Sequence, residues 1–228
     1  MESLEKRELM AANVTANVSS GVLNIQGTNG SDHVQVLVLA NNWTRVISGN
    51  RTIFETPTSS YSSMNANMLN GQDRLHINAL RNNQLTNVNV NMGGGSSEYV
   101  KIEVNATRNL NVNAVQSVGT HVVLTANVID QAIVDFGNDA GSDRLSTHDS
   151  SFNRFNVSMG AGTDYLNMYR TSIRTANINM GAGNDAVFMD QNSDIFGGFV
   201  DGGDGQDSYR KVGAQATRVT LRSIERRG

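Results

Sequence analysis

A short turn motif, Gly-x-Asp, recurs along the chain at nearly constant spacing, and this recurrence restricts the fold more than any other feature. In the C-terminal half the glycines of successive copies are Gly141, Gly162, Gly183 and Gly205, at steps of 21, 21 and 22 residues. Further copies start at Gly30 and Gly71, and degenerate copies at Gly49, Gly95 and Gly119 fill the gaps. A constant step of this length is typical of a solenoid in which each repeat forms one coil.

The segments on both sides of each turn alternate between apolar and polar residues. Before one turn Ala176, Ile178 and Met180 alternate with asparagines, and after another valines stand at every second position, Val34, Val36 and Val38. A period of two residues is the pattern of a half-buried β-strand. Short strands with a fixed repeat predict an all-β fold, a right-handed parallel β-helix of about nine coils of 19–24 residues.

Composition agrees with many strands and turns. The chain has 22 glycines and a single proline, Pro57, and it is rich in asparagine, which favours turns over helices. We expect residues 1–20 to form an N-terminal tail or cap and residues 21–228 to form one β-helix domain. The alternative is an antiparallel sandwich, which also has short alternating strands, but the fixed step with the same turn favours the solenoid.

The turns suggest a metal. The segment Gly202-Gly-Asp-Gly-Gln-Asp207 resembles the calcium-binding nonapeptide of repeats-in-toxin (RTX) proteins, and the turns ending at Asp143, Asp164 and Asp185 are related. The resemblance implies that backbone carbonyls and aspartates of adjacent turns hold Ca²⁺, which prefers six to eight oxygen ligands. The predicted metal residues are Asp143, Gly160, Gly162, Asp164, Gly181, Gly183, Asp185, Gly202, Gly205 and Asp207. Turn capping by the aspartates alone is the alternative hypothesis.

The N-terminal segment carries a second resemblance. Residues 2–12, followed by Val22-Leu-Asn-Ile-Gln-Gly-Thr and Asp32, are similar to the start of large secreted or surface proteins of planctomycete type. That resemblance implies an exported protein, secreted or at the cell surface, and it implies no catalytic residues.

Several function classes lack support in the sequence. The net charge is −3 with no basic stripe, so nucleic-acid binding is not expected, and the apolar runs are too short to span a membrane. The four histidines have no zinc spacing, and the nearly uniform coils offer no long loop to wall a cleft. We therefore expect a non-catalytic surface module, with surface polysaccharide or other surface proteins as candidate partners. A metal-free adhesive solenoid and a carbohydrate-active β-helix enzyme, a lyase or hydrolase, remain the alternatives.

Overall fold

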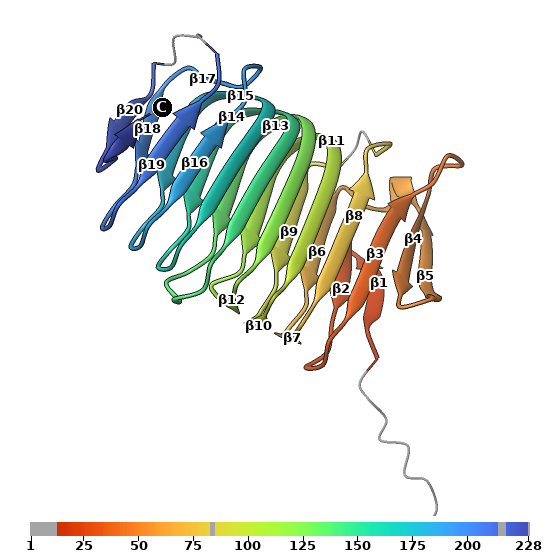
Figure 1. Cartoon of the computed structure of the whole chain (residues 1–228). Coiled ribbons are helices and arrows are strands. Elements are labelled where there is room, and N and C mark those ends of the chain that lie inside the picture. Colours follow the sequence, from red (N-terminus) through yellow and green to blue (C-terminus); the bar gives the residue numbers. More distant parts are fainter. Residues whose placement is uncertain (1–12, 83–84, 214–217, 228) are drawn as a thin grey trace, which may run out of the picture.

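The chain folds into an elongated β-solenoid of about seven turns, seen from the side in Figure 1. This computed structural model describes residues 13–82, 85–213 and 218–227. The predicted parallel β-helix is confirmed, because almost all strand pairs between coils are parallel.

Two sheets form the long walls of the solenoid. The first, which we call the post-turn sheet, follows the glycine turns. It contains β3 (His33–Val38), β8 (Arg74–Ala79), the first parts of β11 (Tyr99–Asn113), β13 (His121–Asp135), β14 (Arg144–Ser158) and β15 (Tyr165–Asn179), then β16 (Ala186–Met189), β19 (Ser208–Lys211) and β21 (Arg226–Arg227).

The second wall, the pre-turn sheet, leads into the turns. It contains β2 (Val22–Gln26), β6 (Ser63–Asn67), β9 (Asn87–Asn91), the last parts of β11, β13, β14 and β15, then β18 (Gly198–Asp201) and β20 (Thr220–Arg222). The four long strands curve from one wall into the other (Figure 1), and β17 (Asp194–Ile195) pairs with β15 at that corner. Within the turns, β7 (Asn70–Gly71), β10 (Gly94–Ser96) and β12 (Gln116–Val118) form a small third sheet.

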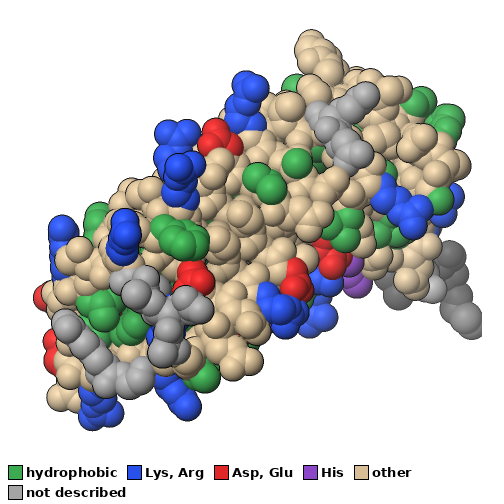
Figure 2. Space-filling model, turned by 90° about the horizontal axis from the view of Figure 1, so that it is seen from above, with side chains coloured by type: hydrophobic (Ala, Val, Ile, Leu, Met, Phe, Trp, Pro, Cys, Tyr) green, Lys and Arg blue, Asp and Glu red, His purple; other side chains and the backbone are tan. Residues whose placement is uncertain are grey.

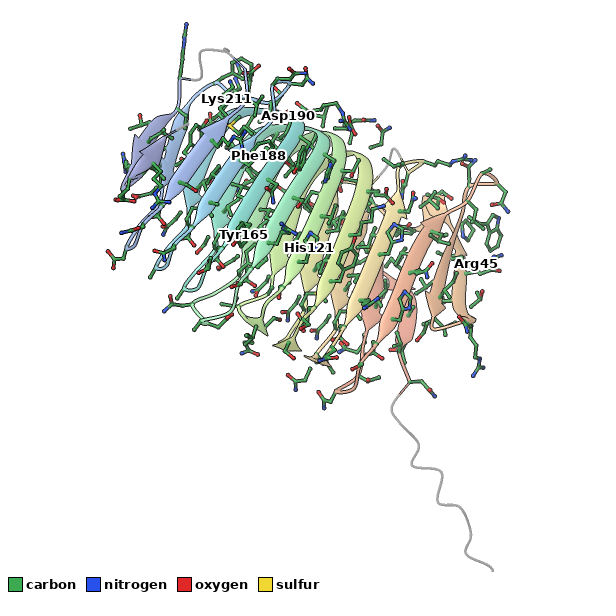
Figure 3. The ribbon with its side chains drawn as sticks, viewed as in Figure 1. Arg45, His121, Tyr165, Phe188, Asp190 and Lys211 are labelled. Carbon is green, nitrogen blue, oxygen red and sulfur yellow. The ribbon has the colours of Figure 1, made fainter. Side chains whose placement is uncertain are left out.

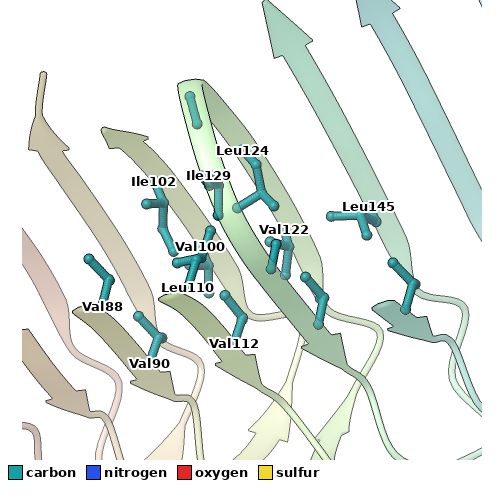
Figure 4. Packing of buried hydrophobic residues seen from close by; sticks show 14 of the residues in the cluster. Val88, Val90, Val100, Ile102, Leu110, Val112, Val122, Leu124, Ile129 and Leu145 are labelled. Carbon is teal, nitrogen blue, oxygen red and sulfur yellow. The ribbon is translucent and has the colours of Figure 1, made fainter. Parts of the chain in front are cut away.

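The core lies between the two walls and is built from the alternating apolar positions. Val100 and Ile102 of the post-turn sheet and Leu110 and Val112 of the pre-turn sheet are buried in one coil, and the next coils repeat the pattern (Figure 4). Each fully buried aliphatic side chain of this size contributes about 1.5–3 kcal/mol. Since every coil buries its residues against its neighbours, the core is continuous along the rod.

An asparagine ladder covers part of the outer surface of the pre-turn sheet. Asn65 Nδ2 donates to Asn24 Oδ1 at 3.4 Å, Asn89 to Asn65 at 2.9 Å and Asn111 to Asn89 at 2.8 Å. The parallel register places these amides one above another. Ile133 interrupts the column, because it is the register partner of Asn111. The abundance of asparagine before the turns thus has a structural reason, stabilisation between coils.

The expected count of nine coils is wrong, because residues 43–57 form a hairpin rather than a coil. β4 (Trp43–Ser48) pairs antiparallel with β3 on one side and with β5 (Arg51–Pro57) on the other, and a 3₁₀ turn, η1 (Thr58–Ser60), follows. Gly49 is the hairpin turn, so the first complete coil steps 41 residues, from Asp32 to Asp73. The coils are therefore less uniform than expected. At the N-terminal end β1 (Thr15–Ser19) also pairs antiparallel, with β2.

The predicted alignment of the turn glycines is confirmed for most positions and wrong for Gly119. Gly71 is the register partner of Gly95, but the partner of Gly95 in the next coil is Ser117. The C-terminal series from Gly141 to Gly205 is stacked, as the close approaches below show. Gly119 lies out of register because the spacing between glycine and the inward position differs among these turns. Gly95 lies three residues before Glu98 and Gly141 two residues before Asp143, whereas Gly119 directly precedes Thr120.

Candidate site in the glycine turns

The acidic residues of the turns point into the solenoid. Asp143 lies two residues before the buried Leu145, and the same spacing separates Asp164 from Leu166. Two residues along a strand return to the same face, so the aspartates share the inward face of the core residues. Asp143, Asp164, Asp185 and Asp207 are 0–2% exposed. Solvent therefore does not screen their charges.

A hydrogen-bonded ladder connects these carboxylates along the rod. The backbone N–H of Asp143 donates to Asp164 Oδ1 at 2.7 Å, that of Asp164 to Asp185 Oδ1 at 2.8 Å and that of Asp185 to Asp207 Oδ1 at 2.8 Å. Thr120 begins this run by donating to Asp143, and Glu225 ends it by accepting from Asp207. Each aspartate thus caps the backbone of the preceding coil, not of its own turn.

The second oxygen of each carboxylate is buried and has no hydrogen-bond partner among the described residues. This holds for Oδ2 of Asp73, Asp143, Asp164, Asp185 and Asp207. Burial raises the pKa of Asp164 and Asp185 to about 7 and that of Asp143 to about 6, and the neighbouring carboxylates add to the shift. A buried polar atom without a partner costs about 1–3 kcal/mol, more when it is charged. These oxygens therefore need a proton or a cation.

The predicted glycines allow the coils to approach closely. A Cβ on Gly183 would lie 1.5 Å from the carbonyl oxygen of Gly162, and one on Gly162 would lie 1.8 Å from that of Gly141. A Cβ on Gly181 would lie 1.6 Å from the carbonyl oxygen of Gly160, and a Cβ on Gly205 would lie 1.5 Å from that of Gly183. No side chain fits at these positions, which explains why glycine recurs there.

Gly160 and Gly202 complete the predicted set. Gly160 stacks on Gly137, and a Cβ on Gly202 would lie 2.5 Å from Oδ2 of Asp207. A shallow hollow of about 470 Å³ runs along the outside of this edge, lined by Gly137, Gly160, Gly181, Gly203 and neighbouring polar residues. The structure therefore gathers all ten predicted residues in one column of turns, with the carboxylates inside and the hollow outside.

The ladder is interrupted in the middle of the chain. Glu98 takes the register position of aspartate there, and its carboxylate accepts a hydrogen bond from Ser117, while Oε1 has no partner. Burial raises the pKa of Glu98 to about 7. The next coil has Thr120 at this position, which leaves a gap in the acidic column. The longest continuous run lies in the C-terminal half, where the sequence predicted it.

The chemistry of this donor set fits calcium in part. The described residues contain no group of three or more His, Cys, Asp or Glu arranged to hold a metal. Two carboxylate oxygens from adjacent coils, with turn carbonyls and water, are the donors that the turns offer, and oxygen is the ligand that calcium prefers. The carbonyls of Gly160 and Gly181 already accept backbone hydrogen bonds from the next coil, so the unpartnered carboxylate oxygens are the primary candidates.

The other acidic pairs that are close in sequence have structural partners. Asp190 accepts from the Ser193 hydroxyl and from the Arg170 backbone, and Asp194 forms an ion pair with Lys211 at 2.9 Å. Asp139 accepts from the backbone of Gly141 in its own turn. These contacts give each carboxylate a role in a turn or an ion pair.

The fold and these turns define the class of protein as a parallel β-solenoid with a buried carboxylate ladder. Comparisons with protein-family models, curated proteins and solved structures give no match to this chain. The resemblance to planctomycete-type surface proteins depends on residues 2–12 and on the segment from Val22 to Asp32, and residues 2–12 lie outside the described residues. Across the described part of the chain, no helix is long and apolar enough to cross a membrane.

Proposed function

We propose that this chain is a rigid, non-catalytic repeat module whose C-terminal coils are stabilised by calcium bound between successive glycine turns. The observation that carries this proposal is the run of buried aspartates, Asp143, Asp164, Asp185 and Asp207, each with one bonded and one unpartnered oxygen. A cation between neighbouring carboxylates would remove both the unmet hydrogen-bonding capacity and the repulsion between like charges.

The dimensions of a stacked sheet suit this role. Equivalent atoms of adjacent coils lie about 4.8 Å apart. Calcium binds oxygen at about 2.3–2.6 Å, so one ion can contact two oxygens that are about 5 Å apart. Four consecutive aspartates provide three such intervals. A smaller ion such as Mg²⁺, which binds oxygen at about 2.0–2.1 Å, spans the same interval less well.

The similarity of the turns to RTX proteins gives this proposal independent support. The proposed location, secreted or at the cell surface, depends on the N-terminal resemblance. A long rod of stacked coils suits a spacer or a scaffold that displays a surface.

Calorimetric titration of the chelator-treated chain with calcium tests the proposal. We expect saturable binding that is lost or much weaker in the double variant Asp164→Asn/Asp185→Asn, because an amide oxygen lacks the charge. Asp130→Asn is the matched control, because it removes one carboxylate charge outside the ladder. This side chain is about half exposed and forms a long ion pair with Arg154 at 3.6 Å.

Two results would contradict the proposal. If the intact chain takes up no calcium, the carboxylates are protonated or structural and the solenoid is metal-free. If the control variant loses binding as the double variant does, the ion binds at a surface site elsewhere.

A further inference from the structure

A row of aromatic and cationic side chains crosses the outer surface of the post-turn sheet. The parallel register pairs Arg74 with Tyr99, Tyr99 with His121, His121 with Arg144 and Arg144 with Tyr165. We call these five residues the Tyr–Arg row. Each follows the inward acidic position of its turn by one residue, so each points outward. Figure 3 shows His121 and Tyr165 at the same level along the strands.

The rings and guanidinium groups of the row contact one another. The Tyr99 and His121 rings pack edge to face with centroids 5.4 Å apart, and the Arg144 guanidinium lies 5.7 Å from the Tyr165 ring centroid. Tyr165 is 40% exposed. A second group of rings, His148, Tyr169 and Phe188, stacks further along the same strands. Aromatic surface is therefore available over several coils.

The row borders a surface hollow. This hollow of about 360 Å³ lies at the interrupted part of the acidic ladder and is lined by Arg74, Ser97, Glu98, Tyr99, Gly119 and His121. Its walls combine a guanidinium, a phenol ring and an imidazole. Burial, together with nearby Arg144, lowers the pKa of His121, so that its ring is neutral at neutral pH. The positive charge of the row at neutral pH therefore comes from its arginines.

Both arginines are available to a ligand. In the described part of the chain neither Arg74 nor Arg144 forms an ion pair, whereas His76 and Lys101 on the same face pair with Glu103. The two arginines are three coils apart, which corresponds to about 14 Å. An unpaired guanidinium is suited to bind carboxylate with two parallel hydrogen bonds.

We propose that the Tyr–Arg row binds an acidic polysaccharide that lies across the coils. Arg74 and Arg144 bind carboxylates of separate sugar units. The ring of Tyr99 packs against the apolar C–H face of a sugar between them, and the ring of Tyr165 packs against a sugar one coil beyond Arg144. The hollow beside Tyr99 receives one unit of the polymer. The proposal is independent of calcium, because the carboxylate ladder points to the opposite face of the strand.

Sparse charge favours this ligand over a nucleic acid. A single strand of nucleic acid carries one phosphate per nucleotide, and its affinity depends on how many phosphates are neutralised. The row has two arginines over three coils, the protein has a net charge of −3, and Glu103 lies on the same sheet. On the face drawn in Figure 2, lysines and arginines are dispersed rather than gathered in a continuous stripe.

Binding of polygalacturonate, measured by calorimetry with chelator present, tests the proposal. Dextran is the neutral control polymer, and oligothymidylate tests the alternative anion. We expect the intact chain to bind polygalacturonate and not dextran. Arg74→Gln/Arg144→Gln should weaken binding by at least about tenfold, as the loss of charged hydrogen bonds predicts. Tyr165→Ala should weaken it as well, whereas Tyr165→Phe keeps the ring and should retain affinity.

The chain offers a matched control for the loss of charge. Arg108 and Arg174 are exposed, lie at the opposite corner of the coil and are also three coils apart, since their neighbours Thr107, Ile129, Phe152 and Ile173 are register partners. Arg108→Gln/Arg174→Gln should leave binding unchanged. Equal losses in both double variants, no binding by the intact chain, or binding of oligothymidylate without polygalacturonate would each overturn the proposal. Circular dichroism of every variant confirms that it is folded.

Discussion

The close stacking of the turns predicts a steep cost for a single methyl group at Gly183. The residue has φ of +144°, and a Cβ would lie 1.5 Å from the carbonyl oxygen of Gly162. The backbone conformation alone costs about 1–3 kcal/mol for alanine, and separating two packed coils adds about 1–3 kcal/mol. Gly183→Ala should therefore destabilise the fold by about 2–6 kcal/mol. For a chain of this length that lowers Tm by about 4–24 °C.

Two control variants separate backbone conformation from steric contact. Gly49 has φ of +58° with open space around its would-be Cβ, so Gly49→Ala should cost only about 1 kcal/mol. Gly30 has no such φ and its nearest atom is 3.6 Å away, so Gly30→Ala should be close to neutral. Thermal melts of the three variants provide the comparison. If Gly183→Ala has the same melting temperature as Gly49→Ala, the coils do not approach as closely as the structure requires.

Three further predictions concern the ladder, the amides and the core. In chelator, the raised pKa values of Asp164 and Asp185 mean that the folded chain holds their protons more tightly than the unfolded chain does. The stabilisation of the fold by these two protonated carboxyls should be greatest below about pH 4 and should be lost as pH rises towards 7. The urea midpoint of unfolding should therefore be lower at neutral than at mildly acidic pH. A higher midpoint at neutral pH would contradict this. Asn89→Ala removes two interstrand amide bonds and should cost about 1–2 kcal/mol in urea unfolding, and no loss would show that the exposed ladder is energetically neutral. Phe152→Ala should cost about 3–5 kcal/mol, because the ring is buried and stacks on Phe155 at 4.5 Å; a cost below 1 kcal/mol would argue against this packing.

The fold could be predicted to a large extent because its local signals agree. Alternation around Ile178 and the regular glycines in the C-terminal half indicate the same strands and the same step. The first coil could not be predicted in this way. Gly49 follows an alternating segment, as the true turn glycines do, and only the antiparallel pairing of β4 with β5 distinguishes a hairpin from a coil. Pairing partners that are distant in sequence are not encoded in a local pattern.

The sequence indicated which turns stack on one another, but not that their aspartates point inward. The two-residue spacing between Asp143 and the buried Leu145 could have indicated an inward carboxylate, because residues two apart share a face of a strand. The ladder bonds could not be predicted, since they join each carboxylate to a backbone N–H 21 or 22 residues away. The Tyr–Arg row was missed for a related reason. Tyr99 and Tyr165 follow turns of different lengths, and only the register of β11, β13, β14 and β15 aligns them.

The melting temperature of the intact chain at neutral pH, with chelator and then with millimolar calcium, tests whether calcium binds between the turns and stabilises the solenoid. Calcium that binds only the folded chain stabilises it by about 2.7 kcal/mol at a hundredfold excess over Kd. For a chain of this size that corresponds to a rise in Tm of about 5–10 °C. Asp164→Asn/Asp185→Asn should lose this rise and should be no less stable than the parent chain in chelator. An unchanged Tm for the intact chain in calcium would contradict the account and leave a metal-free solenoid.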